Sequence, residues 1–248
     1  MRSANPALKE NTFSGVRAAV NEPAMTLQGT STKSLVLVLL TVFSASFTWT
    51  AVAGGNVGIL GPAVLIGGLG GFVVALITTF KPNVSPYTAP IYAALEGLLL
   101  GAISSLYNSR FAGIPMQAVA LTFGVFIALM VIYRLGIIRA TDRFRTGVVA
   151  ATGGIMLMYL MSFVLSFFGV QMSFLHDSSP LSIGISLVIV GVAALNLILD
   201  FDFIERGVAN RAPKYMEWYA AFGLLVTLVW LYLELLRLLS KLQGRGRN

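Results

Sequence analysis

Half of the acidic residues in this chain lie inside segments that are otherwise apolar. Of the 10 Asp and Glu residues, five fall in such segments: Glu96, Asp200, Asp202, Glu217 and Glu234. An acid at the centre of a bilayer costs about 2.5–3.5 kcal/mol on insertion scales, and acids there commonly mark a pathway for ions or protons. The 17 Lys and Arg residues lie almost entirely at the ends of the apolar segments. We therefore expect too few nearby cations to neutralise the buried acids as ion pairs.

Asp200 is the leading candidate for a group that binds and releases protons. Asn196 lies four residues earlier and shares a face with Asp200 if the segment is helical. A second carboxyl group in contact with Asp200 would share its proton, so the two groups would titrate as a unit. After deprotonation the pair would offer the hard oxygen ligands that suit Ca²⁺. An alternative stays open, in which Asp200 is a protonated core acid bonded to Asn196.

The helical rise predicts that three acids lie at similar depth near the inner membrane face. At about 1.5 Å per residue, Glu217 lies roughly 5 Å, Asp200 roughly 9 Å and Glu96 roughly 10 Å from the inner end of its segment. By the same rise, Glu234 lies roughly 30 Å along the last segment. Depth therefore favours Glu217 as the partner of Asp200.

Two of the acids also have structural interpretations. Glu217 precedes Trp218 and Tyr219, which is typical of an interfacial residue in an aromatic belt. Asp202 lies four residues before Arg206, the favourable order for an ion pair near a helix end. The candidates for lining a pore or binding a cation are Glu96, Asn196 and Asp202.

Composition excludes several other kinds of site. The chain has no cysteine and a single histidine, His176, which excludes thiolate and multi-histidine metal sites. His176 lies in a polar stretch with Asp177, which we interpret as a solvated turn. The motifs of presenilin-like proteases, Tyr-Asp and Gly-x-Gly-Asp, are absent. We expect no enzymatic activity and no cofactor, with calcium as a permeant ion only.

The elements that must position the acids are long apolar helices. Residues are 56% hydrophobic and 11% charged, against about 25% charged in a soluble domain, so we expect an all-α membrane protein. Each of seven segments is long enough to cross a core of about 30 Å. The segments are Ser34–Val52, Gly58–Phe80, Pro90–Tyr107, Met116–Arg134, Gly147–Phe168, Leu181–Ile204 and Tyr215–Leu239. This predicts a transmembrane domain over 34–240, a polar, disordered cytoplasmic tail over 1–33 and a basic tail over 241–248.

The second segment contains a run of small residues. Its glycines are Gly67, Gly68, Gly70 and Gly71, and such runs typically allow close helix packing in membranes. A hinge is the functional alternative.

Lys and Arg predict the orientation in the membrane. With a cytoplasmic N-terminus, 12 of the 17 basic residues lie inside, and Arg110 alone lies in the outer loops. Seven crossings would leave the basic C-terminus outside, which disagrees with this rule. Either the last helix is broken or re-entrant, or the rule is overruled locally. The net charge of +7 is explained by these loops and tails, so we expect no nucleic-acid binding.

Three stretches resemble the bacterial branch of the Bax inhibitor-1 family, also called the transmembrane Bax inhibitor motif family. They are Tyr92-Ala-Ala-Leu-Glu96-Gly-Leu-Leu-Leu-Gly101, Ile-Leu-Asp200-Phe-Asp-Phe-Ile-Glu-Arg-Gly207 and Leu231-Tyr-Leu-Glu234-Leu-Leu-Arg237-Leu-Leu. The resemblance implies seven helices with the last one central, and a pH-sensitive calcium leak gated by two acids on the sixth and seventh helices.

The resemblance also nominates the residues of the gate. Asp200 matches the acid of the sixth helix, and the Leu-Tyr-Leu-Glu run nominates Glu234 on the seventh. An alternative alignment places Thr227 there. The proton sensor would thus combine Asp200 with Glu234 or Glu217, and Asp200 with Glu234 would bind calcium transiently. The family's arginine on the second helix has no match, since only Lys81 lies nearby.

Two functions follow as expectations. The first is a cation leak, for calcium above all, in the cytoplasmic membrane, with the lipid bilayer and the permeant cations as its partners. The second is a regulatory protein that binds and modulates a membrane protease or other membrane machinery, with the polar N-terminal tail as the contact.

Overall fold

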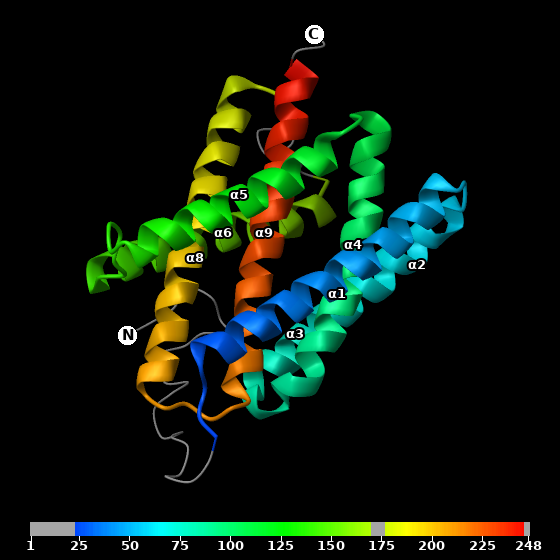
Figure 1. The fold of residues 1–248 in the computed structure, drawn as a ribbon. Helices are drawn as coiled ribbons and strands as arrows, with labels where there is room; N and C mark the ends of the chain where they lie inside the picture. Colours follow the sequence, from blue (N-terminus) through cyan, green and yellow to red (C-terminus); the bar gives the residue numbers. More distant parts are fainter. Residues whose placement is uncertain (1–22, 170–176, 246–248) are drawn as a thin grey trace. The chain divides into compact units, whose positions relative to one another are not determined.

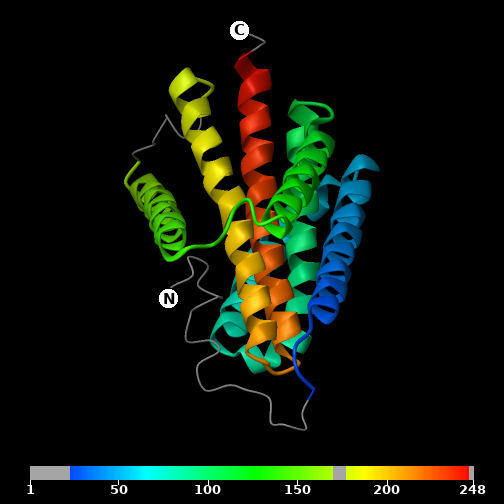
Figure 2. The same cartoon turned by 60° about the vertical axis from the view of Figure 1, so that its left-hand side comes forward.

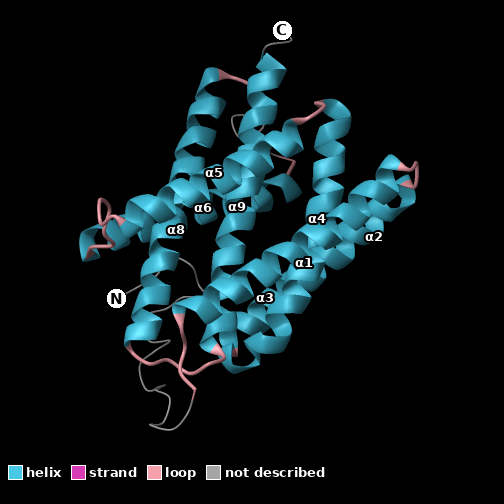
Figure 3. Cartoon of the chain, viewed as in Figure 1, coloured by secondary structure: helices cyan, strands magenta, loops and turns pink. Residues whose placement is uncertain are grey.

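The computed structural model describes residues 23–169 and 177–245. Over these residues the chain is helical and forms no β-strand (Figure 3). The described part contains seven spans long and apolar enough to cross a membrane, which confirms the predicted all-α class. The spans are Leu27–Ala53, Val57–Phe80, Pro82–Arg110, Ile114–Arg134, Asp142–Phe167, Pro180–Ala209 and Met216–Arg245.

The helices keep these bounds with few exceptions. Single helices form the first span and the last four, which are α1 (Leu27–Ala53), α5 (Ile114–Arg134), α6 (Asp142–Phe167), α8 (Pro180–Ala209) and α9 (Met216–Arg245). The third span contains α4 (Ser85–Arg110). The second span is divided into α2 (Leu60–Leu65), a π-helical turn (Ile66–Gly70) and α3 (Gly71–Phe80).

Several helices extend beyond the predicted bounds, and α1 begins seven residues early. The side chain of Thr26 caps α1 by accepting a hydrogen bond from the backbone N–H of Gly29 at 3.0 Å. The hydroxyl groups that follow, such as that of Ser31, donate to carbonyl oxygens one turn back and fit the helix despite their polarity. Of the predicted tail over 1–33, the residues from Leu27 on therefore belong to α1, and 1–22 lie outside the described residues.

The chain divides into two compact units, and α8 and α9 contribute to both. Unit 1 contains Gly113–Leu199 and Thr227–Asn248, and unit 2 contains Pro6–Ala112 and Asp200–Val226. Unit 1 therefore contains α5, α6, the first part of α8 and most of α9. Unit 2 contains α1 to α4, the end of α8 and the start of α9.

Unit 2 is held together by close packing of small residues. Figure 1 shows α1 alongside α4, and the glycines of α4 face the α1 backbone. A Cβ on Gly97 would lie 2.4 Å from the carbonyl oxygen of Thr41, and one on Gly101 would lie 2.3 Å from that of Ala45. A Cβ on Gly67 would similarly lie 2.7 Å from the carbonyl oxygen of Leu95. These approaches confirm close packing for Gly67, while the hinge stays a prediction.

Unit 1 is joined by polar contacts between its helices. Figure 2 shows the yellow part of α8 beside the red part of α9, where the ammonium group of Lys241 donates to the hydroxyl of Ser186 at 2.8 Å. On α6, Thr152 accepts a hydrogen bond from Asn196 of α8 at 2.9 Å.

The last helix, α9, is the most enclosed of the described spans. In its most apolar window 72% of the residues are buried, against at most 50% in the other spans. Most side chains of α9 are therefore covered by other residues, while its central position among the seven helices stays a prediction. Because α9 is continuous from Met216 to Arg245, a broken last helix is the wrong explanation for the basic C-terminus.

Candidate functional site

Four of the five predicted acids are buried. The exposed fraction is 0% for Glu217, 1% for Asp200, 2% for Glu234 and 8% for Glu96, whereas Asp202 is half-buried. The partners of each buried carboxyl group decide whether it can carry a charge, because a buried charge is stable only when it is paired and hydrogen-bonded.

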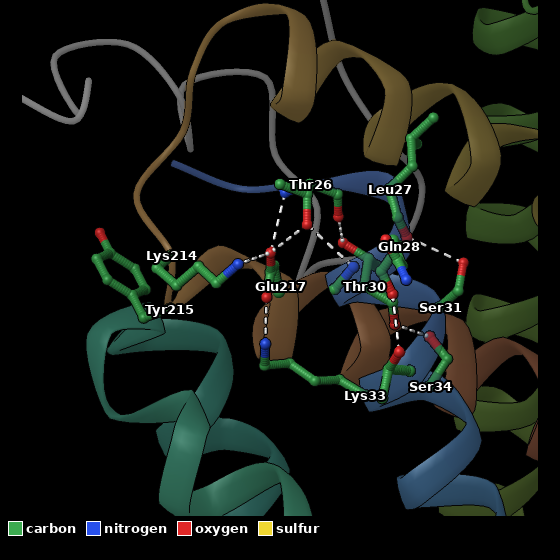
Figure 4. Close-up of polar contacts among 12 residues, drawn as sticks. Thr26, Leu27, Gln28, Thr30, Ser31, Lys33, Ser34, Lys214, Tyr215 and Glu217 are labelled. Carbon is green, nitrogen blue, oxygen red and sulfur yellow. Dashed lines mark hydrogen bonds and ion pairs between the residues drawn. The ribbon is translucent and has the colours of Figure 1, made fainter. Parts of the chain in front are cut away.

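Glu217 lies in a dense polar cluster at the start of α9 (Figure 4). Its Oε1 accepts hydrogen bonds from the backbone N–H and the hydroxyl of Thr26, both at 2.9 Å. Lys214 pairs with the same oxygen at 2.8 Å, and Lys33 pairs with Oε2. The expectation that nearby cations are too few is therefore wrong for Glu217. Two lysines and the cap of α1 hold it as a fixed anion.

The backbone around Glu217 explains how the first helix reaches this acid. The N–H of Met25 donates to the carbonyl oxygen of Ala212 at 2.7 Å, which places the start of α1 against the loop before α9. A Cβ on Gly29 would lie only 2.2 Å from Oε1 of Glu217, so glycine is needed for this approach. The N-terminal end of α1 also favours a negative charge. The contact therefore ties α1 to α9.

Trp218 adds an aromatic contact to the same cluster. The ammonium group of Lys33 lies 5.6 Å from the centre of the Trp218 ring, within the range of a cation–π interaction. The ion pairs of Glu217 thus sit beside an aromatic side chain of the predicted belt.

Glu234 is also ion-paired. In unit 1, Arg237 donates to both of its carboxyl oxygens at 3.1 Å, and the Tyr159 hydroxyl of α6 donates to Oε1 at 2.8 Å. Arg237 also donates to the Tyr159 hydroxyl and lies over its ring. The expectation of too few cations is therefore wrong for Glu234 as well. This acid joins α6 to α9 through a three-residue network.

Asp202 and Asn196 have local partners. Asp202 forms the predicted ion pair with Arg206 at 2.9 Å, which is confirmed. The amide nitrogen of Asn196 donates to Thr152 at 2.9 Å and to the carbonyl oxygen of Val192 at 2.8 Å. Both N–H groups of this amide are thus used, so only its oxygen is available to a protonated Asp200. That bond stays a prediction.

Glu96 lies in an apolar and aromatic part of unit 2. Its carboxyl group lies on the same face of α4 as Tyr92, which is one turn earlier. The Tyr92 ring meets Phe222 of α9 edge-on at 5.0 Å between centroids. A Cβ on Gly71 would lie 3.2 Å from Oε2 of Glu96, so the residue after the π-helical turn leaves room for the acid. The spacing of Tyr92 and Glu96 was the signal that could have predicted this shared face.

The polar stretch near His176 agrees in part with the predicted turn. His176 itself lies outside the described residues. Its neighbour Asp177 is exposed and accepts a hydrogen bond from the Ser179 hydroxyl at 2.8 Å, which holds the pKa of the Asp177 carboxyl below its usual range.

Residues 23–169 and 177–245 contain no group of three or more His, Cys, Asp or Glu side chains that could hold a metal ion. Asp200 belongs to unit 2 and Glu234 to unit 1, so their contact stays a prediction. A cation would need one or two carboxyl groups supplemented by carbonyl or water oxygens, as hard cations accept.

Comparison with known proteins gives one match. A family model described as Bax inhibitor 1 like matches residues 5–244. No curated protein and no solved structure matches the chain. The family match covers nearly the whole sequence and all seven apolar spans. The chain therefore belongs to the Bax inhibitor 1 like family of membrane proteins.

Proposed function

We propose that the chain is a proton-sensitive cation leak with calcium as its main permeant ion. The observation that carries the proposal is the burial of Asp200, which is 1% exposed in the membrane-spanning helix α8. An acid inside a membrane is costly and usually marks a pathway for ions or protons. The family resemblance supports the proposal, since it implies a pH-sensitive calcium leak.

In this proposal Asp200 is the principal titrating group. In its ionised form it attracts cations and offers oxygen ligands, and in its protonated form it does neither. Glu96 is the second acid of the pathway, because it is buried on α4 and its neighbours Tyr92 and Gly71 are uncharged. Glu217 has no place in the gate, since two lysines hold its carboxyl group.

Glu234 has a different role in the proposed leak from the one predicted from the sequence. Its carboxyl group is bonded to Arg237 and Tyr159, so a proton on Glu234 would weaken an existing ion pair. Release of Arg237 would free the α6–α9 contact and could thereby open the pathway. Glu234 would then act through Arg237, while the transient calcium site of Asp200 and Glu234 stays a prediction from the sequence.

The test is calcium flux in proteoliposomes that enclose a fluorescent calcium indicator. The full-length protein is compared with Asp200→Asn at pH values between about 6 and 8. We expect the flux of the wild type to depend on pH. Because asparagine is fixed in the neutral form, the flux of Asp200→Asn should lose most of its pH dependence, with Glu96 and Glu234 accounting for the rest, and differ about tenfold from the wild type at one end of the range.

Asp202→Asn is the matched control, because Asp202 lies two residues away in an ion pair with Arg206. It should keep the pH dependence. Glu96→Gln and Glu234→Gln test the two further acids. A wild-type flux no greater than that of protein-free vesicles would refute the leak. A flux in Asp200→Asn that matches the wild type at every pH would refute the role of Asp200.

A further inference from the structure

The connection between α5 and α6, residues 134–143, carries an excess of positive charge. Its three arginines, Arg134, Arg139 and Arg143, are exposed. None of them forms an ion pair within the part of the chain that the structure describes. The acid of this connection, Asp142, pairs instead with Arg145 at 3.6 Å. Three guanidinium groups therefore have no counter-charge among the described residues.

The basic residues near the α8–α9 loop are used differently. Of the three cations there, Lys214 pairs with Glu217 at 2.8 Å and Arg206 pairs with Asp202 at 2.9 Å. Orientation in the membrane depends on the number of basic residues near the ends of the spans, whether or not they are paired. The unpaired arginines of the α5–α6 connection are thus a feature beyond the one that sets orientation.

Two large aliphatic side chains are exposed on the same connection. Leu135 is 69% exposed and Ile137 is 70% exposed. Between them, Gly136 has a φ of 70° and turns the chain directly after α5. A Cβ on Gly136 would lie 3.6 Å from a guanidinium nitrogen of Arg139, so the charged end of Arg139 lies over this turn. Aliphatic and guanidinium groups are therefore neighbours on one short loop, which is drawn in pink in Figure 3.

The ends of two membrane spans place this connection at the level of the lipid headgroups. The first span ends at Arg134 and the next begins at Asp142, so the residues between them leave the hydrocarbon core. Phosphate groups lie at this level, and one guanidinium group can donate two parallel hydrogen bonds to a phosphate. Exposed aliphatic side chains at this level match the acyl chains just below the phosphates. A phosphate ion free in water would leave Leu135 and Ile137 uncovered.

We propose that the α5–α6 connection binds the phosphate of an anionic phospholipid. Arg134, Arg139 and Arg143 hold the phosphate, and their excess charge selects anionic over zwitterionic lipid. Leu135 and Ile137 lie against the acyl chains of the same lipid. The bound lipid would join the end of α5 to the start of α6. This site lies within unit 1 and is independent of the proposed cation leak.

The test is native mass spectrometry of the full-length protein released from detergent micelles, which counts the lipids that stay bound. The protein is titrated separately with phosphatidylglycerol, phosphatidylcholine and sodium phosphate. We expect phosphatidylglycerol to bind at least about tenfold more tightly than phosphatidylcholine, because each basic residue near the membrane surface adds attraction to anionic lipid. Sodium phosphate at an equal concentration should leave the bound phosphatidylglycerol in place.

Charge-matched variants locate the site. Replacing the three arginines of the connection together by glutamine should weaken phosphatidylglycerol binding at least about tenfold and leave phosphatidylcholine binding unchanged. The control variant removes the same charge from three exposed residues elsewhere, Lys81→Gln, Arg211→Gln and Arg245→Gln. It should bind phosphatidylglycerol like the wild type.

Three outcomes would overturn the proposal. Equal wild-type affinities for phosphatidylglycerol and phosphatidylcholine would show that the guanidinium groups select no headgroup. An equal loss of affinity in the arginine variant and the control variant would reduce the effect to net charge. Displacement of the lipid by sodium phosphate at an equal concentration would make free phosphate the ligand.

A single substitution keeps the question open to test if the triple arginine variant does not fold. Arg143→Gln changes one exposed side chain in the first turn of α6. It should weaken phosphatidylglycerol binding about fivefold, the share of one basic residue at the membrane surface. An unchanged affinity in Arg143→Gln would then refute the site.

Discussion

The ion pairs of Glu217 predict a large and specific loss of stability when its carboxyl group is removed. In Glu217→Ala, the backbone N–H and hydroxyl of Thr26 lose their acceptor, and Lys33 loses its carboxylate. Removing one partner of a buried ion pair costs about 3–5 kcal/mol. The Lys33 side chain is 18% exposed, which places the expected loss near the lower limit, at about 3 kcal/mol. Lys214 adds at most about 1 kcal/mol, because its side chain is 48% exposed.

Glu217→Gln separates the charge from the hydrogen bonds. The amide oxygen of glutamine can still accept from Thr26, while the attraction to both lysines is lost. We expect a loss of about 2 kcal/mol, in the range of one hydrogen bond to a charged group. The free energy of unfolding is measured by titration with sodium dodecyl sulfate in mixed micelles. Tryptophan fluorescence reports on the transition, since one of the three tryptophans, Trp218, lies beside Lys33.

A double-mutant cycle assigns the loss to individual pairs. The coupling free energy between Glu217→Ala and Lys33→Met should be about 2 kcal/mol, and that between Glu217→Ala and Lys214→Met should be under about 1 kcal/mol. Asp142→Ala is the matched control, because its side chain is 75% exposed and its pair with Arg145 spans 3.6 Å. It should cost less than about 1 kcal/mol. A Glu217→Ala loss no larger than that of Asp142→Ala would refute the reasoning.

Two further predictions concern the packing of each unit. In unit 2, Gly97→Ala and Gly101→Ala should each cost about 1–3 kcal/mol of unfolding free energy, because the added methyl groups would meet α1 carbonyl oxygens at 2.4 and 2.3 Å. Gly124→Ala, whose Cβ would meet nothing within 4 Å, is the control, and equal losses at all three positions would contradict the packing. In unit 1, Tyr159→Phe and Glu234→Gln should be coupled by about 0.5–3 kcal/mol, because their side chains are hydrogen-bonded at 2.8 Å. Strictly additive losses would show that this bond contributes nothing.

The helices could be predicted because their signals are local. A run of about 20 apolar residues is enough to indicate a crossing, and each of the seven predicted segments overlaps one observed span. The ion pair of Asp202 and Arg206 was also predictable, since residues four apart on a helix are neighbours. The start of α1 was missed because its polar first turns hide the cap at Thr26. A Thr directly before the first helical turn is a typical N-cap residue and indicates where the helix begins.

The partners of Glu217 were not predictable in this way. Lys33 lies 184 positions from Glu217 in the sequence, and Thr26 lies 191 positions away. No spacing rule connects such residues, because their contact depends on how α1 meets the loop before α9. The partner Arg237 of Glu234 is a different case. It lies three positions away on the same helix and could have been found from the sequence, whereas Tyr159 on α6 could not.

The basic residues at the ends of the spans therefore have two roles, and this changes which acids can titrate freely. Lys33, Lys214 and Arg237 were counted only as markers of orientation, yet each pairs with a buried acid. A basic residue three or four positions away neutralises an acid when the helix presents both on one face, as α9 does for Glu234 and Arg237. Glu96 and Asp200 have only uncharged residues at those positions, so no basic residue of the same helix turn neutralises them as Arg237 neutralises Glu234. This difference is the reason to expect that flux responds to changes at Asp200 and that stability responds to changes at Glu217.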